Sequence, residues 1–287
     1  MNTLLNYLPD SFKSLPIQIY ERWQPEAFCN RKIKQSKSNE FDKLKGTIAD
    51  CKISKNRKFI TKRIRQENKE QDLKQLTLIG MVSVYPAMES WTEASILEYD
   101  SEHEAMVQKK FYKLWKNSDI IKIPKVKSFT QDSIKMENFE WPRLGDVIDN
   151  KELFKNAVKS TTFFFFYSIK KWGLVHGDIS VFNILVDPES TNGRICVIDY
   201  GMTCELNNED LNKIKEIDKL TGYPALIAEA WNKEGFQFSM EWWSKINLLE
   251  IHSNNISGVY VRSLISLTKL ACMSNLIVQK SYIFQNF

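Results

Sequence analysis

The stretch from Gly173 to Gly201, GLVHGDISVFNILVDPESTNGRICVIDYG, decides the fold of this chain. Within it, Asp178 comes two residues after His176 and five residues before Asn183, in a turn between two apolar runs. We interpret this H-x-D-x-x-x-x-N spacing as a catalytic loop, because it places carboxylate and amide groups where phosphoryl-transfer chemistry needs them.

A second apolar run, residues 195–198, ends at Asp199-Tyr200-Gly201, and the polar link before it, DPESTNG at residues 187–193, is typical of a β-hairpin. The hairpin would let Asn183 and Asp199 meet. Turns favour Asp, Asn and Gly for conformational reasons alone. The occurrence of His, Asp, Asn and Asp-Tyr-Gly together in this order, beside apolar runs, nevertheless indicates a functional site.

Transfer of the ATP γ-phosphoryl group requires Mg²⁺ held against the phosphates and a group that orients the attacking hydroxyl. Hard oxygen ligands suit this ion, so we expect Asp199 and the amide oxygen of Asn183 to hold it. Asp178 would accept a hydrogen bond, and then the proton, from the acceptor hydroxyl. The catalytic candidates are Asp178, His176 and Ser180.

These residues resemble the catalytic loop and metal-binding motif of the protein-kinase-like superfamily, which includes protein kinases, RIO and ABC1-type atypical kinases, and aminoglycoside and choline phosphotransferases. Conventional protein kinases carry Arg after the His and usually Lys two residues past the Asp, whereas this chain has Gly177 and Ser180. The HGDIS loop is therefore more similar to the atypical and small-molecule branches, and to fungal kinase-like proteins of unassigned role.

The resemblance implies an α+β, bilobal protein-kinase-like fold. It would have a small antiparallel β N-lobe with one αC-like helix, followed by a mainly helical C-lobe. We expect an N-terminal extension at residues 1–40, the N-lobe at 41–140 and the C-lobe at 141–287.

Two strands are expected at residues 46–54 and 58–65, and they would begin the N-lobe sheet. In the second strand, Lys62 shares a face with apolar residues. FITK resembles the VAIK-type strand, whose lysine holds the α- and β-phosphates in kinases. A surface lysine is the alternative for Lys62, and Lys74 is the second candidate for the phosphate-binding residue.

Further along the chain, residues 66–75 are charged and predicted as a loop. Residues 76–85, LTLIGMVSVY, are predicted as a strand or strand pair that ends at Pro86. This stretch resembles an insertion before the helix of the lobe.

From Glu98 onward the apolar spacing becomes helical and predicts the αC-like helix. Residues 100–114, DSEHEAMVQKKFYKL, resemble this helix in ABC1-type and fungal kinase-like proteins. The resemblance implies that Glu104, or as second choice Glu102, pairs with the strand lysine. Acidic residues at a helix start also favour the helix dipole whatever the function.

A short strand at residues 133–139 stops before Pro142, where a two-lobed kinase has its hinge. The resemblance implies that backbone groups near Glu137 and Phe139 bind the adenine edge, with Met136 as the gatekeeper-like side chain behind the base. An edge strand ended by proline is the alternative interpretation.

Residues 152–172 predict a helix buried on most sides and ended by Gly173, with its four consecutive phenylalanines in the core. Further helices are predicted at 208–219, 224–233, 240–252 and 258–279. No A-P-E-type segment occurs near residues 203–222, and no G-x-G-x-x-G motif occurs in the sequence. We therefore expect no control by activation-loop phosphorylation, and the loop that covers the phosphates is not identified.

Composition limits the class of protein further. Five cysteines show no paired or metal-type spacing, and the N-terminus lacks a basic leader or an apolar signal core, which predicts an intracellular protein, cytoplasmic or nuclear. The longest aromatic run, residues 161–167, is too short to span a bilayer, so no membrane segment is expected. Residues 31–74 hold 15 Lys or Arg against 6 Asp or Glu. Nucleic-acid binding by this basic segment is a secondary hypothesis, and solvated surface is the preferred one.

Three function classes follow. The first is an ATP- and Mg²⁺-dependent phosphotransferase acting on a protein Ser or Thr hydroxyl. The second is a small-molecule kinase of the aminoglycoside or choline type, with an acceptor pocket lined by Trp231, Glu241, Trp242 and Trp243. The third is a nucleotide-binding pseudokinase or interaction module, which the missing glycine loop favours and the intact Asp178, Asn183 and Asp199 oppose.

Overall fold

The computed structural model describes residues 43–45, 49–66, 69–82, 86–209 and 211–212, with seven residues between 259 and 274. All of them belong to the unit formed by residues 41–287. Several predictions lie outside the described residues: the N-terminal extension 1–40, the helices 224–233 and 240–252, most of helix 208–219, and the pocket residues Trp231, Glu241, Trp242 and Trp243. Within the predicted helix 258–279, Val259, Tyr260 and Leu267 are helical and buried.

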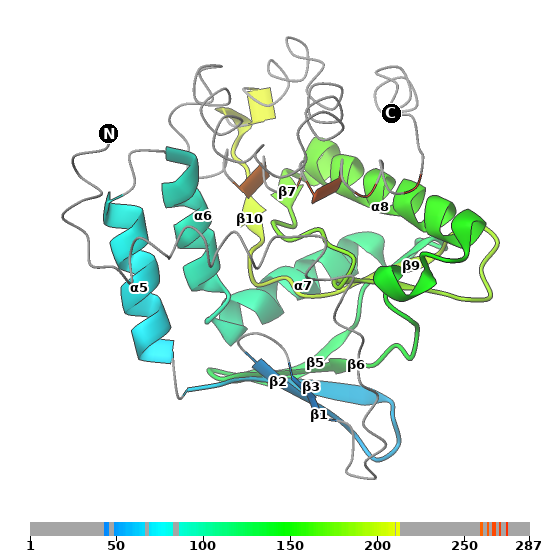
Figure 1. Ribbon diagram of the computed structural model, residues 1–287, viewed down its shortest axis with the longest axis horizontal. Coiled ribbons are helices and arrows are strands. Elements are labelled where there is room, and N and C mark those ends of the chain that lie inside the picture. The colour runs from blue at the N-terminus through cyan, green and yellow to red at the C-terminus, as the bar shows by residue number, and fades with distance from the viewer. Residues whose placement is uncertain are drawn as a thin grey trace. The chain divides into compact units, whose positions relative to one another are not determined.

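Five antiparallel strands form one sheet in the order β1-β2-β3-β6-β5 (Figure 1). The strands are β1 (Lys43–Lys45), β2 (Ala49–Ile53), β3 (Phe59–Ile64), β5 (Val126–Thr130) and β6 (Ser133–Glu137). In β3, Lys62 lies directly opposite Cys51 of β2 and Ile134 of β6. The strands predicted at 58–65 and 133–139 are confirmed, and so is the predicted antiparallel N-terminal sheet.

Helix α7 (Ser101–Trp115) packs against β5 and β6 and corresponds to the predicted αC-like helix. Asp100 caps its N-terminus, because its carboxylate accepts hydrogen bonds from the backbone N–H groups of Glu102 and His103 at 3.0 and 2.9 Å. The cap fixes where the helix begins, and with it the direction in which the next side chain, Glu104, leaves the helix.

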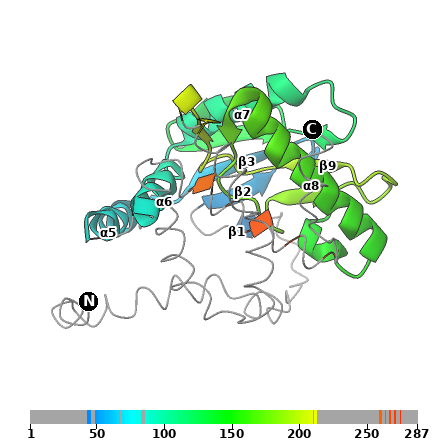
Figure 2. The same cartoon turned by 90° about the horizontal axis from the view of Figure 1, so that it is seen from above.

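One helix stands where a loop and a strand were predicted, and a second helix follows it where no element was predicted. Helices α5 (Lys69–Val82) and α6 (Pro86–Leu97) pack side by side (Figures 1 and 2). The predicted loop 66–75 and strand 76–85 are therefore wrong. Pro86 is the first residue of a helix, a position its fixed φ suits, and not the end of a strand. Residues 69–76 are rich in the good helix formers Lys, Glu, Gln and Leu, and the helix they form continues into the apolar run that follows. That run is too short for its spacing to distinguish a helical period from a strand period.

The second half of the described chain is built around helix α8 (Lys151–Trp172). Its small strands are β4 (Ile121–Lys122), β7 (Leu174–Val175), β8 (Ile184–Val186), β9 (Ile195–Val197) and β10 (Cys204–Glu205), and a 3₁₀ turn, η1, covers Leu144–Val147. β8 and β9 pair as the predicted hairpin, β4 joins β9 in parallel, and β10 pairs with β7. The hairpin and the β7–β10 pair position the catalytic loop between them.

Helix α8 supplies most of the core on which the loop rests. Asn150 caps its start, and Gly173 ends it in the left-handed region at φ 66° with its N–H bonded to the Ile169 carbonyl. Of the four phenylalanines predicted in the core, Phe164, Phe165 and Phe166 are buried, while Phe163 is half-buried and packs against the same core. Phe164 lies 5.5 Å from the ring of Phe111 on α7. Among the described residues, no helix has the length and apolar character needed to cross a membrane.

Candidate functional site

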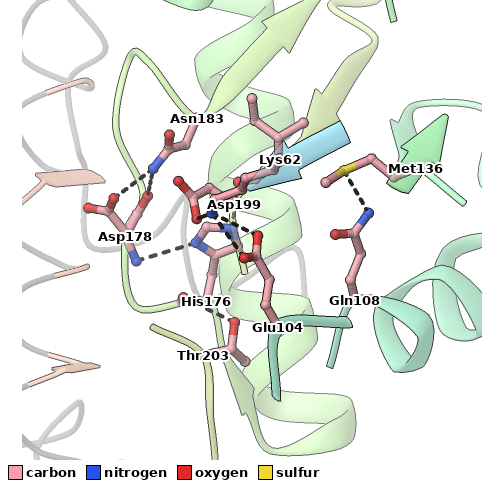
Figure 3. A network of polar contacts seen from close by, with 10 residues as sticks. Lys62, Glu104, Gln108, Met136, His176, Asp178, Asn183, Asp199 and Thr203 are labelled. Atoms are coloured by element: carbon pink, nitrogen blue, oxygen red, sulfur yellow. Dashed lines mark hydrogen bonds and ion pairs between the residues drawn. The ribbon is translucent and has the colours of Figure 1, made fainter. Parts of the chain in front are cut away.

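Three charged side chains from distant parts of the chain meet at the centre of the site (Figure 3). Lys62 Nζ on β3 donates to Glu104 Oε1 and Oε2 on α7 at 3.0 and 2.9 Å, and to Asp199 Oδ1 after β9 at 2.8 Å. The Lys62 side chain is 12% exposed and that of Glu104 only 1%. The contact expected between Lys62 and Glu104 is present, and Lys62 is shared with the predicted metal ligand Asp199.

The attraction between Lys62 and the two carboxylates offsets the free-energy cost of burying charged groups in this cluster. Burial alone would lower the pKa of Lys62, but the carboxylates of Asp199 and Glu104 raise it by more, so Lys62 keeps its proton. Burial raises the pKa of Glu104 above its usual value, and Lys62 opposes that rise. For Asp199, partial burial acts to raise the pKa, and the charge and hydrogen bond of Lys62 outweigh it and lower the pKa. The lysine therefore keeps Asp199 ionised.

The residues around Asp199 hold it by backbone shape and aromatic packing. Asp199 has φ 66°, a left-handed conformation that aspartate tolerates better than most residues. The next residue, Tyr200, is fully buried, with its ring 5.0 Å from Phe111 and 4.9 Å from His176. The buried ring anchors the turn that carries the Asp199 carboxylate.

Asn183 and Asp178 form a hydrogen-bonded pair inside the catalytic loop. Asn183 Nδ2 donates to the Asp178 carbonyl at 3.0 Å and to Asp178 Oδ2 at 2.7 Å (Figure 3). This orientation leaves Asn183 Oδ1 as the amide atom available to a cation. Ser180 is half-buried, and its hydroxyl accepts from the N–H of Phe182 at 3.3 Å.

His176 acts on the loop through both ring nitrogens. Nδ1 accepts from the Asp178 N–H at 3.3 Å, so the proton lies on Nε2, which donates to the Ile198 carbonyl at 3.2 Å. The ring is buried and joins the residue before Asp199 to the backbone of Asp178. This geometry suits a positioning function for His176.

The two predicted metal ligands lie at the same end of the hairpin. The Ile198 N–H donates to the Asn183 carbonyl at 3.0 Å, which brings the backbones of Asn183 and Asp199 close together. Their side chains have different partners, Asp178 for Asn183 and Lys62 for Asp199. Among the residues described, no three His, Cys, Asp or Glu side chains form a metal-type cluster. One amide and one carboxylate oxygen fit a hard cation such as Mg²⁺ that takes its other ligands from phosphate or water.

At the predicted hinge, Met136 is buried, and its sulfur lies 3.4 Å from Nε2 of Gln108 on α7. Glu137 is bound at both ends to Lys125: its backbone N–H donates to the Lys125 carbonyl at 3.0 Å, and its carboxylate accepts from the Lys125 N–H. The Phe139 ring lies 5.0 Å from that of Trp141. A function in adenine binding stays a prediction for Met136, Glu137 and Phe139.

Sequence analysis missed several residues that complete the site. Gln108 is fully buried one helical turn after Glu104, a spacing that could have indicated it. Cys51 lies opposite Lys62, and burial raises the pKa of its thiol. His103 and Thr203 contact each other across 100 residues of sequence, and nothing in the sequence indicated that contact. Among the described residues, Cys51 and Cys196 are free thiols.

Comparison with known proteins places this geometry in context. The family described as ABC1 atypical kinase-like domain matches residues 58–219. No curated protein matches the chain. A similar solved structure is the complex structure of Rv3197-erythromycin from Mycobacterium tuberculosis, with 16% sequence identity over 93% of this chain and 85% of that chain and a TM-score of 0.50. At this identity the likeness concerns the fold alone.

Proposed function

This chain belongs to the family of ABC1 atypical kinase-like domains, and we propose that it is an ATP- and Mg²⁺-dependent phosphotransferase that transfers the γ-phosphoryl group to a hydroxyl, preferably of a protein Ser or Thr. The observation that carries the proposal is the Lys62–Glu104–Asp199 cluster. A lysine held by a helix glutamate next to a carboxylate at a strand end is the arrangement that positions nucleotide phosphates in kinases.

The nucleotide would be held from three sides. Lys62 would bind the α- and β-phosphates, while Asp199 and the Asn183 amide oxygen would hold Mg²⁺, which supplies charge neutralisation at the phosphates. Backbone groups near Glu137 and Phe139 would bind the adenine edge, with Met136 behind it. In this proposal the lobes divide near residue 140.

Asp178 would orient the acceptor hydroxyl and take its proton. Its carboxylate is half-buried and fixed by the short hydrogen bond from Asn183, so little rearrangement is needed before transfer. His176 would hold the backbone of Asp178 in place, and Ser180 would stabilise the turn that follows. Ser180 stands where conventional kinases usually carry a lysine, which supports an atypical mode of binding the transferred phosphate.

Two other functions would give different results in the transfer assay described below. A small-molecule acceptor is the first, since the solved relative from Mycobacterium tuberculosis is a complex with erythromycin. A nucleotide-binding module without turnover is the second. Residues 46–48, which connect β1 to β2 where a phosphate-covering loop would lie, are outside the described part of the chain. The intact Asp178, Asn183 and Asp199 favour turnover.

The decisive experiment is a transfer assay with γ-labelled ATP and Mg²⁺ against a cell extract separated into protein and metabolite fractions. Label in the protein fraction supports the proposal, and label only in metabolites supports a small-molecule acceptor. Thermal shift should accompany it, because a ligand at about 100 times its Kd stabilises a protein by about 2.7 kcal/mol. The absence of both transfer and a thermal shift at millimolar ATP would contradict nucleotide chemistry altogether.

A further inference from the structure

The segment after Asp199, residues 201–206, packs tightly against the catalytic loop; we call it the post-strand segment. Gly177 has φ 84°, and a Cβ there would lie 2.1 Å from the Met202 carbonyl oxygen. The Thr203 hydroxyl donates to the His176 carbonyl at 3.2 Å, in a fully buried position. Strand β10 then pairs with β7, and the Leu206 N–H donates to the Gly173 carbonyl at 2.7 Å.

The same segment is also attached to helix α7. His103 Nε2 donates to the Thr203 carbonyl at 3.2 Å, and Lys110 Nζ pairs with Glu205 Oε2 at 2.6 Å. His103 and Lys110 are seven residues apart, which places them two turns apart on one face of the helix. Glu104, the partner of Lys62, directly follows His103 in this helix. Any swing of α7 away from the post-strand segment would therefore pull Glu104 from Lys62.

We propose that His103 and Lys110 are positioning residues that, with Gly177, keep helix α7 fixed on the post-strand segment, so that Glu104 stays paired with Lys62 without phosphorylation of the chain. The consequence for turnover rests on the proposed function, while the structural part does not. The Lys62–Glu104 pair then forms without a modification of the chain.

Gly177 explains why contact can replace phosphorylation. In conventional kinases the corresponding arginine grips a phosphorylated activation loop, which couples that loop to the rest of the site. Here any side chain at residue 177 would collide with the Met202 carbonyl, and positive φ disfavours all residues but glycine. The absence of a side chain lets backbone pack on backbone. The contacts of His103 and Lys110 extend that packing to α7.

Hydrogen–deuterium exchange on the unliganded, phosphatase-treated full chain tests the structural part without any need for turnover. His103→Ala should speed exchange in residues 101–115 about fivefold, which corresponds to about 1 kcal/mol, the usual net value of one hydrogen bond. His103→Gln is the matched control, because its amide N–H can still donate to the Thr203 carbonyl. The assignment would be overturned if residues 101–115 exchanged at the same rate in His103→Ala and wild type. It would also be overturned if His103→Ala and His103→Gln lost the same amount of protection from exchange.

A charge swap gives an independent test if His103→Ala folds poorly. Lys110→Glu and Glu205→Lys should each speed exchange in the same helix, and the double variant should return exchange to the wild-type rate. If the double variant exchanged as fast as the single variants, the assignment of Lys110 would be contradicted.

The consequence for the site is measured as the Mg²⁺ concentration that gives half-maximal stabilisation by ATP. It should rise in His103→Ala and not in His103→Gln, because Lys62 released from Glu104 competes with the metal for Asp199. Phosphatase treatment should leave the wild-type value unchanged, and a requirement for phosphorylation would overturn the proposal. Failure of ATP to bind any variant would count against the proposed function, while the exchange data would still decide the structural part.

Discussion

The ion-pair cluster of Lys62, Glu104 and Asp199 and the loop cluster of His176, Asp178 and Asn183 are built in opposite ways. The ion pairs join residues 42 and 137 positions apart. The side-chain bonds of the loop to Asp178 span two and five positions. One cluster is ionic and exists only once β3, α7 and β9 have assembled, whereas the bonds to Asp178 in the other cluster form within the loop itself. The loop cluster should therefore keep its stability when a charged side chain is replaced by a neutral one, whereas the ion-pair cluster should lose stability.

The largest expected effect tests the loop cluster. Asp178→Asn should lower the rate of phosphoryl transfer by about 10²–10⁴-fold, because the variant loses the group that takes the proton. ATP binding and folding should stay unchanged, since the asparagine oxygen can still accept from Asn183 as Asp178 Oδ2 does. Transfer assays and thermal shift with ATP and Mg²⁺ measure the two separately. A loss of stability that matches the loss of rate would contradict the division into two independent clusters.

The next effect tests the ion-pair cluster. Lys62→Met should cost about 3–5 kcal/mol of folding free energy, because the Glu104 carboxylate would be left buried without its cationic partner. Binding of ATP should be lost as well. Denaturant unfolding measures the first effect and thermal shift the second. The matched control is Lys135→Met on the neighbouring strand, where the exposed lysine only covers the Phe59 ring at 5.3 Å, an interaction usually worth about 0.5–1 kcal/mol. Equal losses of folding free energy in Lys62→Met and Lys135→Met would show that burying Glu104 without Lys62 does not destabilise the fold.

The two clusters also differ in how far sequence alone could predict them. Asp178 and Asn183 bond within one turn, so their spacing in the sequence already contains their geometry. The choice of Glu104 over Glu102 came from resemblance, and only the fold shows that Glu104 is buried while Glu102 is exposed. The contact between His103 and Thr203 joins two elements whose relative placement no local pattern specifies. Tertiary contacts of this kind are the part that the sequence could not predict.

The error at residues 66–85 has a different physical origin. The resemblance implied the fold class, whereas the sheet, helix α7, helix α8 and the β8–β9 hairpin were predicted because each has a clear period or a clear stop signal. Helices α5 and α6 were missed, because Pro86 can end one element or begin another and because the run before it is short. Only packing of α5 against α6 resolves that ambiguity.

A smaller effect concerns pH. Lys62 lowers the pKa of Asp199 below its ordinary value of 3.8, so the unfolded chain binds more protons than the folded one as pH falls below that value. This contribution to stability is complete above pH 3.8 and is lost as pH falls through the lowered pKa. Asp199→Asn and Lys62→Met should both flatten the rise of stability with pH in acid, as measured by denaturant unfolding from about pH 2.5 to 6. A slope that survives in Lys62→Met would show that the lysine is not its cause.

The smallest effect separates charge from burial as the source of fragility. Gln108 is more buried than Lys62, and its Oε1 has no hydrogen-bond partner, while Nε2 donates to the Pro124 carbonyl at 2.7 Å. Gln108→Met keeps the volume and relieves the unpaired oxygen, which favours folding, but it leaves the Pro124 carbonyl unpaired, which opposes it. Each of these neutral terms is about 1–3 kcal/mol, so they largely cancel, and unfolding should change by about 1 kcal/mol or less. If burial alone decided the cost, Gln108→Met would lose more stability than Lys62→Met. The reverse order in denaturant unfolding would show that the unpaired charge of Glu104 makes the ion-pair cluster fragile.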